Sequence, residues 1–357
     1  MKKTVIVAAA VLIAAALLLP LKTEAISAKR GILVDGTTGR VLWEKNADEK
    51  SLIASTTKIM TAIVVCRRCN PLDQVRIPKE AVGIEGSSMY LREGEVLTVQ
   101  ELLYGLMLHS GNDAAMALAL YCGGTAEGFA GLMNDKAREL GMTNTHFVNP
   151  HGLDDPAHYS TARDLAILAR YAMQDPIFRT TVACRNIRTG DRYLTNHNKL
   201  LWRVEGANGV KTGYTRAAGR LLVSGACRNG RQLIAVTIDD PDDWTDHARL
   251  LEEGFSRYTQ TKLVCQDQFL GRIPVEGGEA GEVTVYAGSD FSWPIASGER
   301  VSVRLPGGFV YAPVAENAAA GYAHIFIDDN PVGKVPIYYG KTVEQLPKEK
   351  KGIFQKS

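Results

Sequence analysis

The stretch that decides how this chain is interpreted runs Ala54-Ser-Thr-Thr-Lys-Ile-Met-Thr-Ala62. Its apolar residues recur at helical spacing, which predicts a helix from Ala54 to about Val65. A serine hydroxyl is a poor nucleophile unless a base lies beside it, and residues three apart on a helix share a face. Apolar neighbours disfavour the charged form of Lys58, so its neutral amine can take the proton of Ser55. The alternative is that Ser55 only caps the helix while Lys58 extends to solvent.

A second short motif, Ser110-Gly111-Asn112, interrupts two apolar helical stretches. Its functional interpretation places Ser110 beside Lys58 as a proton relay and lets the Asn112 amide hold a substrate amide group. The alternative is a simple turn between two helices.

A third motif, Lys211-Thr212-Gly213, lies on a predicted strand. There Gly213 permits close approach of a ligand backbone, while Lys211 and Thr212 supply a cation and a hydroxyl for a carboxylate. The alternative is an ordinary surface strand. Because all three motifs occur in order, we interpret them as parts of one catalytic site.

The N-terminus has the order of a secretory signal. Lys2 and Lys3 precede an apolar run from Val5 to Leu21, and Thr23-Glu24-Ala25 offers small residues around a cleavage site. We therefore predict a signal peptide over residues 1–25, with an uncleaved membrane anchor as the alternative. Either way, the rest of the chain is expected outside the cytoplasm.

Length and charge narrow the classes of protein to which this chain can belong. A chain of 357 residues with 45% apolar and 22% charged residues is typical of a globular protein of two domains. Removing residues 1–25 takes away three lysines and one glutamate, which lowers the formal net charge from +2 to zero. The composition therefore gives no support for nucleic-acid binding.

The six cysteines are too sparse for a disulfide scaffold. Cys66-x-x-Cys69 is the only close pair, and free or loosely paired thiols are weighed against a redox or metal role. No second such pair completes a zinc site, and no cofactor or metal is expected. His151 and His158 lie in a loop, where turn and surface positions are expected rather than metal binding.

Strands at both ends of a helical middle predict an α+β layout, with one antiparallel sheet carrying packed helices. Residues 31–35 and 40–44 form a predicted hairpin, and Arg228-Asn-Gly-Arg231 joins another. The remaining predicted helices are 98–108, with Thr98 and Glu101 as a capping box, then 112–121, 129–140, 161–173 and 246–258.

The sequence pattern changes after about Lys262. Short β-prone runs at 283–286, 300–304, 321–327 and 332–339 are separated by turn residues, and no helix-period segment is present. We predict a catalytic domain over 26–258 and a small all-β domain, a sandwich or barrel, over 262–345. The tail, 346–357, carries four lysines around Ile353-Phe354. A solvated end is weighed there against weak contact with an anionic membrane surface.

The three motifs and their flanks resemble the serine-type D-alanyl-D-alanine carboxypeptidases, a family of low-molecular-mass penicillin-binding proteins. The resemblance covers roughly residues 28–258, and the trailing β domain is similar to the family's usual second domain. Its segments are Leu33–Trp43, Ala54–Ala62, Leu102–Ala115, Asn149–Asp154 and Gly209–Thr215. It implies a β-lactamase/transpeptidase-like fold with a helical subdomain, followed by the β domain.

The resemblance also implies a reaction: removal of the last D-alanine from a peptidoglycan stem peptide that ends in D-Ala-D-Ala. Ser55 would form an acyl-enzyme that water releases, with Lys58 as the base and Ser110 passing the proton to the leaving amine. β-Lactams would acylate Ser55 stably. Lys211 and Thr212 would bind the terminal carboxylate, and the backbone N–H groups of Ser55 and Tyr214 would form the oxyanion hole.

One departure from the family concerns its carboxylate site. Many relatives carry an arginine after the last sheet strands, whereas this chain has Trp244 there. Arg249 or another cation would then have to compensate, or Lys211 and Thr212 would act alone.

Two rival functions remain. A β-lactamase needs a carboxylate base in the loop 149–159, which offers Asp154 and Asp155 but no glutamate. The rival from another class is a catalytically silent protein that binds the cell wall or senses β-lactams.

Overall fold

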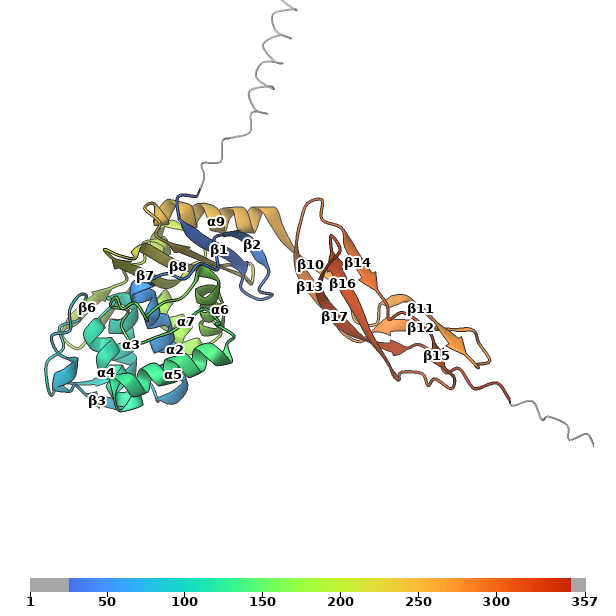
Figure 1. Cartoon of the computed structure of the whole chain (residues 1–357), viewed down its shortest axis with the longest axis horizontal. Coiled ribbons are helices and arrows are strands. Elements are labelled where there is room, and N and C mark those ends of the chain that lie inside the picture. Colours follow the sequence, from blue (N-terminus) through green and yellow to red (C-terminus); the bar gives the residue numbers. More distant parts are fainter. Residues whose placement is uncertain (1–25, 348–357) are drawn as a thin grey trace, which may run out of the picture.

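The computed structural model describes residues 26–347 and has two parts that lie end to end (Figure 1). The predicted signal peptide and residues 348–357 of the predicted tail fall outside the described residues. The first part combines a sheet with helices, and the second is built from strands. The expected α+β fold followed by an all-β part is therefore confirmed.

The first part is organised around a five-stranded antiparallel sheet of order β2-β1-β9-β8-β7. The predicted first hairpin is confirmed as β1 and β2. The second hairpin turns at Asn229 and Gly230, both with positive φ, as its Asn-Gly sequence predicts. The five strands are β1 (Arg30–Asp35), β2 (Val41–Lys45), β7 (Ala207–Thr215), β8 (Gly219–Arg228) and β9 (Arg231–Ile238).

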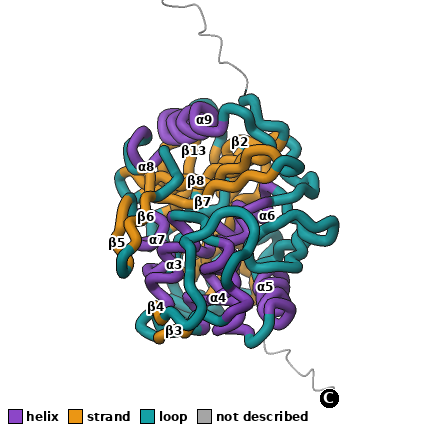
Figure 2. The backbone as a smooth tube through the Cα atoms, turned by 90° about the vertical axis from the view of Figure 1, so that its left-hand side faces the viewer, coloured by secondary structure: helices purple, strands orange, loops and turns teal. Residues whose placement is uncertain are grey.

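Helices cover both faces of this sheet (Figure 2). One face carries α9 (Asp243–Arg257), which packs on β8 and β9. The other face carries the helical subdomain, in which α6 packs on β1 and β9, and α7 on β7. Its helices are α2 (Lys58–Arg68), α3 (Val99–Leu108), α4 (Asn112–Gly123), α5 (Ala126–Glu139), α6 (Ala162–Ala172) and α7 (Pro176–Ala183).

Capping residues set several of these helix boundaries. Thr98 and Glu101 form the expected capping box at α3, and Thr161 caps α6 by accepting the N–H of Asp164. The sequence did not predict α7, whose start is fixed by Asp175 and by Pro176 at its first position. The smaller elements are η1 (Ala54–Thr57), η2 (Lys79–Ala81), α8 (Leu200–Arg203), β3 (Gln74–Arg76), β4 (Val96–Thr98), β5 (Asn186–Thr189) and β6 (Arg192–Thr195).

The second part contains a six-stranded sheet of order β14-β16-β17-β12-β11-β15 and a two-stranded ribbon, β10-β13. Both contribute to one apolar core, which includes Val264 of the ribbon and Ile325 of the larger sheet. All four predicted β runs fall on strands. The strands are β10 (Tyr258–Val264), β11 (Phe269–Glu276), β12 (Glu282–Ala287), β13 (Phe291–Ala296), β14 (Val301–Arg304), β15 (Val310–Tyr311), β16 (Ala319–Ile327) and β17 (Asn330–Tyr339).

The two parts touch where α9 runs into β10. Arg40, in the turn before β2, donates to a carboxylate oxygen of Glu299 over 3.0 Å and also to the Pro294 carbonyl. The Tyr258 hydroxyl donates to the Leu42 carbonyl over 3.2 Å. The contact is therefore polar and small. None of the helices among residues 26–347 is both long enough and apolar enough to cross a membrane.

Candidate active site

The predicted helix at Ala54 begins differently from expectation. Ser55 lies in a single 3-10 turn, η1, and the α-helix starts only at Lys58. Side chains three apart in a 3-10 turn are nearly eclipsed, which brings this serine and lysine together. The residue before the serine, Ala54, has φ +44°, a strained conformation that tends to persist at functional sites.

The lysine amine is the centre of a buried hydrogen-bond network. Lys58 is fully buried. Its Nζ donates to Asn112 Oδ1 over 2.6 Å and to the His151 carbonyl over 2.6 Å, and it lies in hydrogen-bond contact with Ser55 Oγ at 2.9 Å. The structure therefore brings the first motif together, and joins it to the Asn112 end of the second.

The environment of Lys58 favours its neutral form. Burial is the main cause that lowers its pKa well below the usual value, and the nearby charge of Lys211 lowers it further. The Asp113 carboxylate acts in the opposite direction. A neutral amine beside the Ser55 hydroxyl can accept its proton, which is the chemistry a general base requires.

The second motif forms a wall of the cavity. Ser110 is buried with φ +61°, a left-handed conformation uncommon for serine, and it lines the same cavity as Ser55. The amide of Asn112 is engaged at both ends, because Oδ1 accepts from Lys58 and Nδ2 donates to the Glu85 carbonyl.

The residue after the second motif fixes the loop that closes this wall. The Asp113 carboxylate accepts the N–H groups of Met89 and Leu91 and the Ser88 hydroxyl, over 2.6–3.1 Å. The same loop brings Ser87 into the cavity. The sequence carries no local signal for Ser87, because its position depends on this carboxylate.

The third motif lies opposite on β7. A Cβ on Gly213 would come within 3.3 Å of the backbone nitrogens of Ser55 and Thr56, so glycine lets the strand run directly beside the 3-10 turn. Lys211 is 1% exposed, and burial lowers its pKa to about 7. Its Nζ donates to the Thr212 carbonyl over 2.8 Å.

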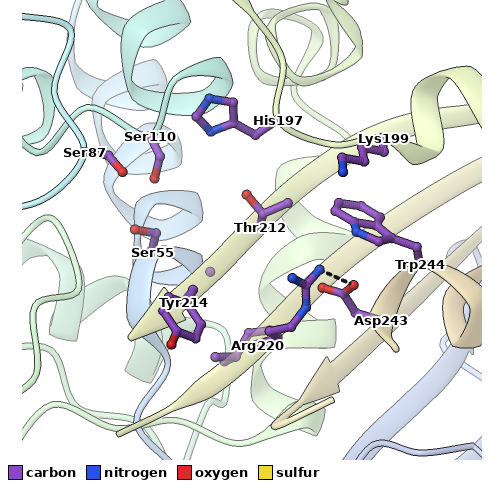
Figure 3. Close-up of a pocket in the computed structure, with 12 residues that line it drawn as sticks. Ser55, Ser87, Ser110, His197, Lys199, Thr212, Tyr214, Arg220, Asp243 and Trp244 are labelled. Carbon is purple, nitrogen blue, oxygen red and sulfur yellow. Dashed lines mark hydrogen bonds and ion pairs between the residues drawn. The ribbon is translucent and has the colours of Figure 1, made fainter. Parts of the chain in front are cut away.

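The cavity between these walls has a volume of about 350 Å³. Figure 3 shows Ser55, Ser87 and Ser110 on the helical side, with Thr212 and Tyr214 across from them on β7. Lys58 and Lys211 are buried behind the walls. The lining residues are Ser55, Ser87, Ser110, His197, Lys199, Thr212, Gly213, Tyr214, Arg220, Leu221, Asp243 and Trp244.

Trp244 does line this cavity, and a cation lies beside it. The guanidinium of Arg220, on β8, is 5.9 Å from the Trp244 ring centroid and donates to Asp243 Oδ1 over 2.6 Å (Figure 3). Arg220 pairs with Tyr214 in the β7–β8 register, which brings it to the cavity. Arg249, which we had considered for this place, is not among the lining residues.

The histidines of the loop 149–159 are buried, so the expected surface position is wrong. His158 Nε2 lies 2.7 Å from Thr57 Oγ1, and burial lowers the pKa of both His151 and His158 to about 4. Their packing beneath η1 explains this burial. Within residues 26–347, no group of three or more acidic, histidine or cysteine side chains is arranged to hold a metal ion.

The two aspartates of that loop lie elsewhere. Asp154 Oδ1 accepts the Thr215 hydroxyl over 2.9 Å, and Asp155 Oδ1 accepts the Ala157 N–H over 2.7 Å. Neither residue lines the cavity that contains Ser55.

Two family models match this chain. Residues 19–242 match "D-alanyl-D-alanine carboxypeptidase", and residues 258–345 match "Penicillin-binding protein 5, C-terminal domain".

Named relatives agree with these matches. D-alanyl-D-alanine carboxypeptidase DacF of Bacillus subtilis is 35% identical over 265 residues, which cover 71% of this chain and 68% of that protein. DacC of Escherichia coli is 33% identical over 344 residues, which cover 91% of this chain and 86% of that protein. The crystal structure of penicillin binding protein 5 from Haemophilus influenzae is similar with a TM-score of 0.77 and 28% identity, over 91% of this chain and all of that one.

Proposed function

Because this chain belongs to the D-alanyl-D-alanine carboxypeptidase family, we propose that it is a serine hydrolase that removes the terminal D-alanine from peptidoglycan stem peptides. The observation that carries the proposal is the 2.9 Å hydrogen bond between the buried Lys58 amine and the Ser55 hydroxyl. That contact joins a nucleophile to a base inside the cavity.

In the proposed reaction, Ser55 Oγ attacks the penultimate carbonyl carbon while neutral Lys58 takes the hydroxyl proton. The backbone N–H groups of Ser55 and Tyr214 stabilise the oxyanion, and Ser110 passes the proton to the leaving D-alanine amine. The ester left on Ser55 is then hydrolysed by water, which restores the hydroxyl. Asn112 orients Lys58, and its Nδ2 reaches a substrate amide by exchanging its bond to the Glu85 carbonyl.

The terminal carboxylate needs a cation at the far end of the cavity. We propose that Thr212 and Arg220 bind it, because both line the cavity and Arg220 keeps further N–H donors beside its bond to Asp243. Lys211 contributes positive potential from behind Gly213, and its charge also helps to keep Lys58 neutral.

β-Lactams would bind as mimics of D-Ala-D-Ala and acylate Ser55. Fast hydrolysis of that acyl-enzyme needs a positioned carboxylate base, and Asp154 and Asp155 both point to other partners. The arrangement therefore favours a penicillin-binding carboxypeptidase over a β-lactamase.

The test combines labelling by a fluorescent penicillin with an assay for D-alanine released from a D-Ala-D-Ala peptide. We expect stable labelling and D-alanine release, both abolished in Ser55→Ala. Ser256→Ala, an exposed serine on α9, is the matched control and should behave like the wild type. Labelling without release would indicate a β-lactam sensor, and rapid loss of label a β-lactamase. Folded protein with neither property would overturn the enzyme proposal.

We also propose that residues 1–25 are removed on export and that the mature protein acts at the outer face of the membrane or in the cell wall. Residues 26–258 then form the catalytic domain and 262–345 the β domain, supported by their separate apolar cores. For the basic tail, 346–357, we expect a solvated end, with weak contact with an anionic membrane surface as the alternative. N-terminal sequencing of the exported protein should begin at Ile26.

A further inference from the structure

Two cysteines lie at corresponding ends of two helices that carry the site. Cys69 directly follows α2, and Cys122 is in the last turn of α4. The two helices pack against each other, and both cysteines are partly buried at the edge of the helical core. Their other ends begin with Lys58 and Asn112, whose side chains meet over 2.6 Å.

The two thiols lie beside each other where α2 packs against α4. They lie within hydrogen-bonding reach, and the Arg68 guanidinium also contacts the Cys122 sulfur. The hydrogen bond from Cys69, together with Arg68, lowers the pKa of Cys122 to about 7 even though burial acts against it. The lowered pKa of Cys122 favours its thiolate, which is the reactive form of cysteine.

The sequence motif Cys66-x-x-Cys69 suggests a different partner, which the structure disfavours. Burial is the main cause that raises the pKa of Cys66 to about 12, so this thiol stays protonated and inert. Cys184 donates to the Asn186 carbonyl over 3.3 Å, away from this pair. Cys227 and Cys265 are exposed.

We propose that Cys69 and Cys122 are a redox site that forms a reversible disulfide between the ends of α2 and α4. The oxidant is a small or protein disulfide. The Cys122 thiolate attacks one oxidant sulfur and releases the other as a thiol. Cys69 then loses its proton and attacks Cys122 Sγ, releasing the second oxidant thiol. Two protein thiols become one disulfide, and the oxidant disulfide becomes two thiols.

The bond would connect helices whose opposite ends hold the proposed base and the amide that orients it. A cross-link of this kind limits the unfolded chain and restricts sliding of α2 along α4. The inference rests on the proposed export for its cellular oxidant, because disulfides persist in oxidising compartments. The chemistry itself is testable in the purified protein.

The first experiment treats the reduced full-length chain with oxidised glutathione under native conditions, followed by alkylation, digestion and mass spectrometry. We expect one linked peptide pair, Cys69 with Cys122, whose mass is two hydrogen atoms below the sum of the two reduced peptides. Cys227 and Cys265 should be alkylated or carry glutathione. A protein in which Cys69 and Cys122 both remain alkylatable, or in which Cys66 pairs with Cys69, would overturn the proposal.

The second experiment measures thermal unfolding of the oxidised and reduced forms. Oxidation should raise the melting temperature by roughly 5–10 °C in the wild type and in the control Cys227→Ser, but not in Cys122→Ser. Should Cys122→Ser fail to fold, the wild-type comparison alone decides. Equal melting temperatures of oxidised and reduced wild type would overturn the constraint on the helices. Neither readout depends on activity, so the disulfide can fail while the proposed hydrolase stands.

Discussion

The two parts of the molecule differ in what they bury. Every polar or charged residue that is buried within residues 26–347 lies in the first part, at or before His247. The second part buries mainly Val, Ile and Ala in its core. Both have closed apolar cores, so the buried charges of the first part are not needed to make a core.

Burying an amine is costly because water no longer solvates its charged form. The first part nevertheless buries two lysines, Lys58 and Lys211, directly behind residues that line one cavity, since each contacts a lining residue, Ser55 and Thr212 respectively. The second part, which contributes no lining residue to that cavity, has a hydrophobic interior of ordinary kind. The buried lysines of the first part are therefore what the proposed reaction requires, and the second part, as far as the structure describes it, contains no such group among its buried residues.

The largest effect is expected for Lys58→Met, which removes the amine and leaves an unbranched apolar side chain that is one atom shorter. D-Alanine release should fall by about 10²–10⁴-fold, because the base is lost. The free energy of unfolding should stay nearly constant or rise, since an apolar side chain replaces a buried amine. Steady-state kinetics and chemical denaturation check both. Lys262→Met, on the exposed surface of the second part, is the control and should change neither. Normal penicillin labelling by Lys58→Met would refute its assignment as the base.

The matching change in the second part is Ile325→Ala, which opens a cavity in its apolar core. We expect the free energy of unfolding of that part to fall by about 2–5 kcal/mol. Turnover of a small D-Ala-D-Ala peptide should be unchanged, because the residue is remote from the cavity that contains Ser55. Val301→Ala, at a position 42% exposed, should cost far less. Parallel loss of activity and stability would show that the two parts are coupled.

The pH profile of kcat/KM should distinguish the roles of the two lysines, Lys58 as a neutral base and Lys211 as a cation. Lys58 must be neutral to accept a proton, so activity should rise with pH through its lowered pKa. Lys211 attracts the substrate carboxylate as a cation. Because its pKa is lowered to about 7, this attraction is lost as the pH rises further. Activity on a carboxylate-ending peptide should therefore pass through a maximum. The alkaline fall should weaken in Lys211→Met, and an unchanged profile there would remove Lys211 from carboxylate binding.

The smallest effect is expected at the contact between the parts. Arg40→Ala removes the bonds to Glu299 and Pro294, which join the two parts and lie away from the cavity that contains Ser55. Catalysis should be unaffected, whereas small-angle scattering should report a broader range of arrangements of the two parts. Arg272→Ala, an exposed ion pair within the second part, should leave the scattering unchanged. An unaltered scattering profile in Arg40→Ala would show that other contacts fix the arrangement.

Local sequence signals predicted much of the architecture. The capping box at Thr98 and the Asn229-Gly230 turn act within a few residues, so the structure shows α3 and the β8–β9 hairpin where they were expected. The sequence does not predict α7, which is short, and it predicts α-helix at η1 because 3-10 and α-helical turns have similar apolar spacing.

The site divides in the same way. The Ser55–Lys58 contact follows from spacing within one turn, and the sequence predicts it. The position of Arg220 does not follow from local spacing, because it depends on the register of β7 against β8. The His151 carbonyl that accepts from Lys58 carries no side-chain signal at all. Local chemistry was therefore visible in the sequence, and long-range partners were visible only in the fold.

The edge position of β7 has a consequence for how the proposed substrate peptide would bind. Within the described residues it has a strand neighbour on one side only, and Gly213 brings it against the nucleophile turn. An extended peptide laid along such an edge is held by main-chain hydrogen bonds, which every residue offers alike. In the proposed reaction, binding along this edge would depend more on the main chain of the last residues than on their side chains. An inhibitor that imitates the peptide main chain would therefore keep its affinity for this edge when the side chains of the wall peptides change.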